Sequence, residues 1–309
     1  LPGNDVECIY QDSRGFICAG TSFGLSMFDG THFRNFVHDP MDSSSLGGTR
    51  IFKMQEDKTG TLWVASENFG LSSIDLKTLK LRNFPIPVNR QLEDRYINTL
   101  YIDQKGLIWI GAETGVSYFD PVAERYIKAE VQGLQANKEI VTFTEDKWGT
   151  LWAIGYNGNI FYKKPNEKIF KELGHKLSMD YVYDVVGFSD NSLLLATSNG
   201  IFDLELRQDA QQSRLKRSPI LSSPTPITNL AVDKNGTLWI ANQLKGIQLY
   251  YQSVSKLQDL NISWLSPLEP GIAIWKDIMM DREGGIWLGG EFGLYHYNSD
   301  YNQFNNYKA

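Results

Sequence analysis

The sequence has few of the residues that mark catalytic, metal-binding or membrane-spanning chains. Only two cysteines, Cys8 and Cys18, occur among 309 residues, which is too few for a disulfide framework or a cysteine-ligated zinc site. The four histidines lie far apart, and none has the i, i+4 partner of a helical zinc site. No apolar run approaches eighteen residues, so we expect no membrane span within this chain. From these absences we expect neither a metal ion nor a cofactor.

The chain also lacks a strong excess of positive or negative charge. The chain carries 30 basic and 36 acidic residues, for a formal net charge of −6, and its lysines and arginines are scattered. A mildly acidic, mixed surface argues against nucleic acid as a partner. A hydrophobic content of 42% is ample for a core and excludes disorder. The chain opens at Leu1 without a targeting segment, so we expect a mature or excised piece.

An internal repeat is the most informative feature that is present. Its core reads Asp-x-x-Gly-x-Leu/Ile-Trp followed by an apolar or small residue, and its Trp position recurs every 42 to 48 residues. A first copy has Cys18 in the Trp position, and a worn fifth copy has Asn191 in the Gly position and Leu194 in the Trp position. The full copies begin at Asp57, Asp103, Asp146, Asp233 and Asp281, and the first begins at Asp12.

A second glycine follows the Trp position by six or seven residues in all seven copies, and a large apolar residue follows that glycine by four. Correlated matches at three positions in seven copies exclude chance. The glycines are Gly24, Gly70, Gly115, Gly158, Gly200, Gly246 and Gly293. The apolar residues are Phe28, Ile74, Phe119, Tyr162, Leu204, Tyr250 and Tyr297.

Each copy predicts four short strands, and no helix-period segment interrupts them. The first strands are expected at 6–11, 51–56 and 97–102, and Asp-x-x-Gly then closes a tight turn into the second. Repeated four-stranded units of this length predict an all-β fold, a seven-bladed β-propeller of four-stranded antiparallel blades. We expect one closed domain over 1–309, formed in chain order, with blade 7 packing on blade 1 and no exchanged strand. The blades are approximately 1–46, 47–92, 93–135, 136–176, 177–220, 221–268 and 269–309.

The repeated tryptophans and aspartates have a structural and a functional interpretation. Tryptophans could stack on sugars or bases, but a mid-strand position that also accepts Cys18 and Leu194 favours packing between blades. Repeated aspartates are interpreted as turn residues and not as an acid/base pair. In the predicted register Cys18 faces Tyr10 and Cys8 faces Gly20. The sulfurs are then diagonal on neighbouring strands and beyond disulfide reach, which predicts two free thiols.

The chain also resembles a known family, the two-component regulator propellers. The resemblance rests on the opening, 1–6, on the repeat Asp-x-x-Gly-x-Leu-Trp-Ile-Gly-Thr-x-x-Gly-Leu and on the loop 39–46, and it covers 1–307. Cys18 and the eroded fifth copy are its departures. The family implies the periplasmic sensor region of a hybrid histidine kinase, an inner-membrane protein that controls glycan-utilisation genes. It further implies an oligosaccharide ligand, a second propeller on the same polypeptide, an immunoglobulin-like domain and a homodimer in the intact sensor. It implies no enzyme activity in this chain, since any kinase core lies elsewhere in the polypeptide.

Other propeller functions fit less well. WD-repeat blades need a Trp-Asp dipeptide, which is absent, and sialidase-type Asp boxes place their glycine one residue earlier. Streptogramin lyases have similar repeats but need a catalytic histidine with acid and metal groups. No Gly-x-Ser-x-Gly and no phosphate-binding glycine loop occurs. A free-standing propeller, acting as a lyase-like enzyme or a protein-binding scaffold, remains the alternative to a sensor.

A ligand is expected on the face that carries the loops between second and third strands and between blades, called here the loop face. The Asp-x-x-Gly turns emerge on the opposite face, the turn face, and are interpreted as too short and uniform to discriminate ligands. Exposed aromatics beside polar side chains suit sugars, although the same residues could instead pack against a second propeller. The candidate ligand-binding residues are Arg50, Asn68, Phe69, Arg95, Glu113, Tyr156, Asn157, Asn199, Glu291 and Phe292. Further loop-face candidates are Arg90, Lys138, Lys245 and Trp264.

Overall fold

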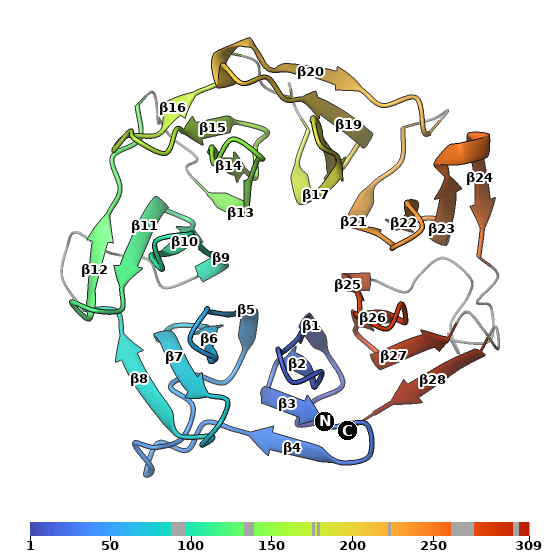
Figure 1. The fold of residues 1–309 in the computed structure, drawn as a ribbon. Coiled ribbons are helices and arrows are strands. Elements are labelled where there is room, and N and C mark those ends of the chain that lie inside the picture. The colour runs from blue at the N-terminus through green and yellow to red at the C-terminus, as the bar shows by residue number, and fades with distance from the viewer. Residues whose placement is uncertain are drawn as a thin grey trace. The chain divides into compact units, whose positions relative to one another are not determined.

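A computed structural model describes residues 1–87, 97–132, 139–174, 177, 180–221, 224–260, 275–298 and 303–308. These form seven antiparallel sheets of four strands each, ordered as β1-β2-β3-β4 in the first and likewise in every other (Figure 1). The predicted fold class, an all-β propeller of seven four-stranded blades, is therefore confirmed. The chain divides into two compact units, 1–129 with 281–309 and 130–280, which are described separately below.

The first unit holds blades 1 to 3 and most of blade 7. The predicted first strands of blades 1 to 3 match the structure at both ends. Its strands are β1 (Val6–Gln11), β2 (Ile17–Thr21), β3 (Gly24–Phe28), β4 (Phe33–Phe36), β5 (Ile51–Glu56), β6 (Thr61–Ser66), β7 (Gly70–Asp75), β8 (Leu81–Pro85), β9 (Ile97–Ile102), β10 (Ile108–Ala112), β11 (Gly115–Asp120), β12 (Arg125–Lys128), β26 (Ile286–Gly290), β27 (Gly293–Asn298) and β28 (Gln303–Tyr307).

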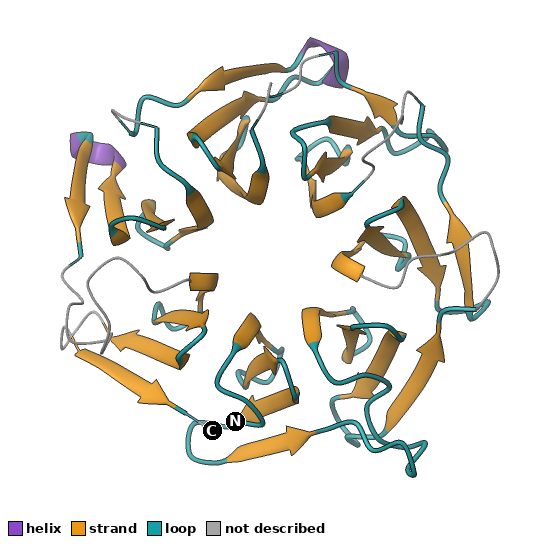
Figure 2. Cartoon of the chain, turned by 180° about the vertical axis from the view of Figure 1, so that it is seen from behind, coloured by secondary structure: helices purple, strands orange, loops and turns teal. Residues whose placement is uncertain are grey.

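The second unit holds blades 4 to 6 and the first strand of blade 7. Its two helical turns, η1 (Ala210–Gln212) and η2 (Gln252–Val254), both connect a third strand to a fourth (Figure 2). Its strands are β13 (Ile140–Glu145), β14 (Leu151–Gly155), β15 (Ile160–Lys163), β16 (Lys171–Glu172), β17 (Val182–Ser189), β18 (Ser192–Thr197), β19 (Gly200–Glu205), β20 (Arg214–Arg217), β21 (Ile227–Val232), β22 (Thr237–Asn242), β23 (Gly246–Tyr251), β24 (Lys256–Asp259) and β25 (Trp275–Met280).

Burial changes from strand to strand within a blade. Every residue of the second strands β2, β10, β14, β18, β22 and β26 is buried, whereas the fourth strands β4, β12, β20 and β24 hold no buried residue. Burial of consecutive residues, whose side chains point to opposite sides, means that both faces of the second strand are covered. It is therefore the strand on which the repeat motif depends.

The repeat motif forms one hydrogen-bonded unit in each full copy. In blade 2, Asp57 Oδ1 accepts the backbone N–H groups of Thr59 and Thr61, which holds the turn, and Gly60 has φ +82°. The second oxygen, Oδ2, accepts the indole N–H of Trp63, whose ring packs 5.6 Å from that of Phe119 in blade 3. The aspartates are turn residues and the tryptophans fill the space between blades, as predicted. Indole-to-carboxylate distances are 2.8 Å for Trp63–Asp57, 2.9 Å for Trp109–Asp103, 2.9 Å for Trp152–Asp146, 3.3 Å for Trp239–Asp233 and 2.8 Å for Trp287–Asp281.

Blade 1 replaces the missing indole with an arginine. Asp12 is fully buried, and its Oδ2 accepts hydrogen bonds from Arg14 Nε at 2.9 Å and Nη2 at 2.5 Å. Arg14 Nη1 also donates to the carbonyl of Leu76 in blade 2. A buried carboxylate without a donor would be strongly destabilising, so the guanidinium satisfies both the charge and the hydrogen-bonding need.

A β-bulge occurs near the start of the first strand in each of the six blades for which the register is described. The register of paired residues skips the strand's second residue. A bulge of this kind redirects the side chain of the extra residue and bends the strand end. The bulge residues are Glu7, Phe52, Asn98, Val141, Tyr183 and Thr228.

Blade 7 packs on blade 1 within the first unit. The ring of Trp287 lies 6.3 Å from that of Phe28, and Tyr307 lies 5.1 Å from Phe28. At the turn, Gln11 donates to Glu283 at 2.9 Å and accepts the backbone N–H of Arg282 at 2.8 Å. Within the described residues the last sheet consists of β25 to β28, so the blades follow chain order there without an exchanged strand, as predicted.

Both cysteines are buried thiols in the predicted register, with Cys18 opposite Tyr10 and Cys8 opposite Gly20. Burial raises the pKa of the Cys18 thiol well above its ordinary value. The Cys8 thiol donates to the carbonyl of Ile51 at 3.7 Å. Neither sulfur is therefore placed or activated for exchange chemistry.

The first prediction concerns the indole–carboxylate bond. Asp57→Asn should lower the free energy of unfolding by about 1–3 kcal/mol, because the amide nitrogen then faces the indole N–H. Burial alone would raise the pKa of Asp57, but hydrogen bonds from Thr59, Trp63 and Thr61 together lower it. The destabilisation caused by Asp57→Asn should therefore be fully present above pH 3.8, the ordinary pKa of an aspartate. It should disappear as the pH falls through the lower pKa that Asp57 has in the folded chain. Denaturant unfolding followed by tryptophan fluorescence measures it.

A double-mutant cycle isolates this bond from the turn hydrogen bonds. In a Trp63→Phe background, Asp57→Asn should cost distinctly less, because the indole donor is already absent. Equal costs in both backgrounds would contradict a role for the indole bond.

The second prediction concerns the thiols. Without reductant, neither Cys8 nor Cys18 should react with a thiol reagent in the folded chain, and both should react after unfolding in denaturant. Burial of both sulfurs gives this result. An unfolded chain with no reactive thiol would show a disulfide instead.

Candidate ligand-binding surface

Backbone hydrogen bonds join the loop between second and third strands to the segment that enters the same blade. In the first unit these bonds run from Ser22 N–H to Asp5 and from Glu67 N–H to Arg50, and in the second unit an equivalent bond occurs in each blade. The two kinds of loop therefore share the loop face, as the sequence predicts. The bonds of the second unit run from Tyr156 to Glu139, from Ser198 to Tyr181 and from Gln243 to Pro226.

Three tyrosines form a partly exposed cluster on the loop face of the second unit. The ring of Tyr156 stacks on that of Tyr181, with centroids 4.7 Å apart and an interplanar angle of 19°, and meets Tyr183 edge-on at 6.1 Å. Tyr181 is 46% exposed and Tyr183 37% exposed. This tyrosine cluster presents ring faces and hydroxyl groups together, a combination suited to a ligand with apolar and hydroxylated surfaces.

The local backbone explains why these rings meet. Tyr156 lies in the loop after β14, and its carbonyl accepts the N–H of Val182 at 2.8 Å. Val182 is flanked by Tyr181 and by the bulge residue Tyr183, so this bond places both rings beside the loop of blade 4. Tyr181 is held in turn by Ser198, whose hydroxyl accepts its N–H at 3.0 Å.

The hydroxyls of Tyr156 and Tyr183 stay protonated at neutral pH. Burial, followed by the charges of Tyr183, Glu139 and Tyr181, raises the pKa of Tyr156, and burial also raises that of Tyr183. Each hydroxyl can therefore donate one hydrogen bond and accept others. The hydroxyls offer no nucleophile or base, so the cluster is suited to binding and not to proton transfer.

Polar candidate residues flank the cluster. Asn157 follows Tyr156, and Asn199 follows Ser198, the residue hydrogen-bonded to Tyr181. Both asparagines are half-buried. The carbonyl of Asn199 accepts Arg217 Nη1 at 2.7 Å, which brings a guanidinium to this loop. The structure thus brings Tyr156 and Asn199 to neighbouring loops, together with two tyrosines that were not predicted.

Arg50, in the first unit, already has an acidic partner. Its Nε and Nη2 atoms lie 2.8 and 2.7 Å from Glu7 Oε1, and its guanidinium packs 5.1 Å from the ring centroid of Phe52. The Glu7 side chain is only 9% exposed. A ligand would have to compete with this ion pair, so Arg50 serves first to link blades 1 and 2.

The other candidates of the first unit lie in separate loops. Phe69 packs on Gly47, where an added Cβ would approach its ring to 2.0 Å, so its ring supports the chain that enters blade 2. Phe292 is half-buried, and its carbonyl accepts the Tyr295 hydroxyl at 3.2 Å. The exposed candidates are Asn68, which has φ +57°, Glu113 and Glu291. Arg90, Arg95, Lys138 and Trp264 lie outside the described residues.

Three residues of this face were missed from the sequence: Glu7, Tyr181 and Tyr183. All three lie at the start of a first strand or just before it. They were missed because the sequence-based candidates came mainly from the loops between second and third strands. The signal for the tyrosines was present as aromatic residues on both sides of Val182 at the start of a first strand.

Neither a metal centre nor a spanning helix occurs in the described part of the chain. No three histidine, cysteine, aspartate or glutamate side chains among those residues are placed to hold a metal ion. None of their helices has the length and apolar character needed to cross a membrane.

Comparisons with known proteins agree with this geometry. Residues 45–68 match the family model of the two component regulator propeller. The extracellular domain of the hybrid two component system BT3049 from B. thetaiotaomicron superposes with a TM-score of 0.76 at 21% identity, covering 96% of this chain and 40% of that one. The extracellular domain of BT4673 from the same organism gives 0.76 at 20%, covering 96% and 39%.

A streptogramin B lyase has the same fold as well. It superposes with a TM-score of 0.74 at 12% identity, covering 99% of this chain and 95% of the lyase. No curated protein matches the sequence. At these identities the superpositions show the propeller fold alone, and the chain spans about 40% of the length of the two sensor domains.

The third prediction tests whether the tyrosine cluster supports the fold. Tyr181→Ala should lower the free energy of unfolding by only about 0.5–1.5 kcal/mol, the value of an aromatic pair, because the backbone bonds that hold the loops remain. The near-UV circular dichroism of tyrosine should change. An insoluble or unfolded variant would show that the cluster is part of the core.

Proposed function

We propose that this chain is an extracytoplasmic ligand-sensing propeller of a two-component sensor histidine kinase, and that it recognises an oligosaccharide on its loop face. The repeat that matches the regulator-propeller model and the likeness to two sensor domains support the first part. The tyrosine cluster carries the second part, because exposed aromatic faces beside amide and hydroxyl groups complement the two kinds of surface on a sugar.

In this proposal the aromatic and the amide residues contact different parts of the sugar. Tyr181 provides a ring face on which the C–H surface of a sugar stacks, and Tyr183 borders it with a second ring. Asn157 and Asn199 provide hydrogen bonds to hydroxyl groups. The chain performs no reaction on the ligand, and phosphotransfer belongs to a kinase core elsewhere in the polypeptide.

The same proposal places the intact protein across the inner membrane, with this propeller in the periplasm. A second propeller and a second copy of the sensor would complete the assembly, which controls glycan-utilisation genes. The reading frame beyond residue 309 tests this directly, because a sensor requires a membrane span and a kinase core there. A frame with neither would favour the lyase-like or scaffold alternative.

The fourth prediction is a binding experiment with the intact sensor. A glycan array identifies an oligosaccharide, and calorimetry then measures its affinity. Tyr181→Ala and Tyr183→Ala should each weaken binding roughly tenfold or more, since aromatic stacking contributes on the order of 1.4 kcal/mol per ring. Tyr251→Ala is the matched control, because Tyr251 is a half-buried tyrosine at the turn-face end of β23.

The outcomes separate the possibilities. Unchanged affinity in both cluster variants would contradict the site while leaving the sensor proposal open. An array without any bound glycan, obtained with a sensor that still signals, would contradict the ligand class.

A further inference from the structure

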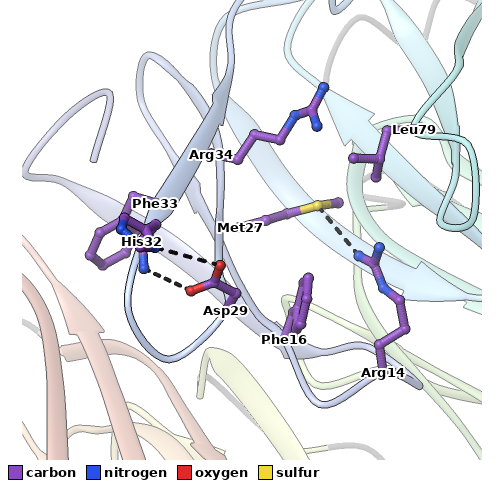
Figure 3. Close-up of a pocket in the computed structure, with 8 residues that line it drawn as sticks. All are labelled: Arg14, Phe16, Met27, Asp29, His32, Phe33, Arg34 and Leu79. Atoms are coloured by element: carbon purple, nitrogen blue, oxygen red, sulfur yellow. Dashed lines mark hydrogen bonds and ion pairs between the residues drawn. The ribbon is translucent and has the colours of Figure 1, made fainter.

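A pocket of about 200 Å³ opens on the turn face of the first unit, between blades 1 and 2. The β1–β2 turn, the β3–β4 turn and the β7–β8 turn supply its walls, and all three lie at the end of the strands opposite the loop face. It is therefore separate from the tyrosine cluster. Its lining residues are Arg14, Phe16, Met27, Asp29, His32, Phe33, Arg34 and Leu79 (Figure 3).

The pocket adjoins the position at which blade 1 departs from the repeat. Cys18 occupies the Trp position and pairs across the sheet with Met27, whose side chain forms the centre of the pocket wall. Arg14 takes over the indole's hydrogen bond, and its Nη2 atom also approaches Met27 Sδ at 3.8 Å. A thiol and an arginine thus stand where other blades have an indole, and the pocket beside them is lined by Met27, which is 3% exposed, and by the half-buried Phe16 and Leu79.

A second departure leaves Arg34, whose guanidinium packs 5.5 Å from the ring centroid of Phe36, without a carboxylate partner among the described residues. Arg34 lies opposite Met27 in the sheet, as Arg82 lies opposite Ser73 one blade later. Arg82 pairs with Glu124 of the following blade at 2.8 Å. Leu79 stands in the place equivalent to Glu124, and none of the described acidic side chains pairs with Arg34.

The backbone confirms that Leu79 and Glu124 are equivalent. Leu79 has φ +58° and Glu124 has φ +48°, and each lies in the turn that precedes a fourth strand. A left-handed conformation is costly for a leucine, so the turn fixes this side chain in place. The junction between blades 1 and 2 therefore combines a fixed apolar wall with an unneutralised guanidinium.

The opposite wall carries a charge that is already satisfied. Asp29 Oδ1 accepts the backbone N–H groups of Thr31 and His32 and the Thr31 hydroxyl, and Oδ2 lies 3.9 Å from His32 Nδ1. The Asp12 carboxylate likewise neutralises Arg14. Arg34 is thus the cation left for a ligand carboxylate, and the Asp29 charge disfavours a ligand that carries two carboxylates.

We propose that this pocket is a binding site for a small organic monocarboxylate with an apolar or ring-shaped body. The carboxylate takes the role that Glu124 plays for Arg82 and pairs with the Arg34 guanidinium, a geometry that favours bidentate hydrogen bonding. The body of the ligand packs against Met27, Phe16 and Leu79. The site is independent of the sugar surface proposed above, so each can stand without the other.

A ¹⁹F NMR titration of the 309-residue chain with 4-fluorophenylacetate tests this site. The carboxylate should bind saturably in the millimolar range, and the neutral 4-fluorophenylacetamide should bind at least tenfold more weakly. Arg34→Gln should weaken carboxylate binding roughly tenfold, and Leu79→Glu should do the same by supplying the missing intramolecular partner. Arg34 is exposed, and the left-handed turn position already holds a glutamate in blade 3, so both variants should fold.

Two controls make the result specific. Arg82→Gln, the same change one blade later, should leave binding unchanged, and so should Tyr251→Ala on the turn face of the second unit. The proposal is overturned if the amide binds as well as the carboxylate, if Arg34→Gln keeps the wild-type affinity, or if no saturable binding occurs.

Discussion

The carboxylate of each Asp-x-x-Gly turn, which is buried or half-buried, is the group on which the blades depend. One oxygen closes the turn between the first two strands, and the other holds an indole against the next blade, as Asp57 does for Trp63. Local turn geometry and blade-to-blade packing are thereby joined in a single side chain. Removing its donor without compensation would leave a negative charge in the core, which explains why Arg14 accompanies Cys18 in blade 1.

The need to satisfy this carboxylate also explains which departures from the repeat motif the fold tolerates. Blade 5 loses the aspartate and the tryptophan together, and Leu194 then fills the space as an apolar residue that is 1% exposed. No carboxylate is left unsatisfied because none is present. Blade 1 keeps Asp12, and so it must keep a donor. The repeat therefore changes in matched pairs, not at single positions.

Much of the fold could be predicted from sequence because the repeat is a local pattern. Turn residues, strand periodicity and the second glycine all act within some twenty residues, so the blades, the first strands and the register of Cys8 and Cys18 could be placed in advance. The hydrogen bond between the indole and the aspartate could not be predicted, since the sequence does not show which carboxylate oxygen faces the interior. The partnership of Arg50 with Glu7 spans 43 residues and two blades, and no local pattern records it.

The candidate surface was partly predictable for the same reason. Loop residues such as Tyr156 could be assigned to a face from topology alone. Tyr183 was missed although aromatic residues flank Val182 in the sequence, because its place on this face depends on a bulge, which is a property of backbone pairing and not of residue type. The turn face was interpreted as uniform, yet the junction of blades 1 and 2 differs from the next one through Leu79 and Glu124. Leu79 and Glu124 lie outside the repeat motif, so the motif alone does not indicate this difference.

The bulge near the start of each first strand has a consequence for how such a protein can change over time. Residues as different as Glu7, Val141 and Tyr183 occupy this position beside the same ladder, because the bulged residue lies between two registered pairs and outside the register itself. The backbone pairing therefore places little restriction on residue type at one position per blade. What restricts each of these positions is the residue's own contact, such as the ion pair of Glu7 with Arg50 or the ring contact of Tyr183 with Tyr156.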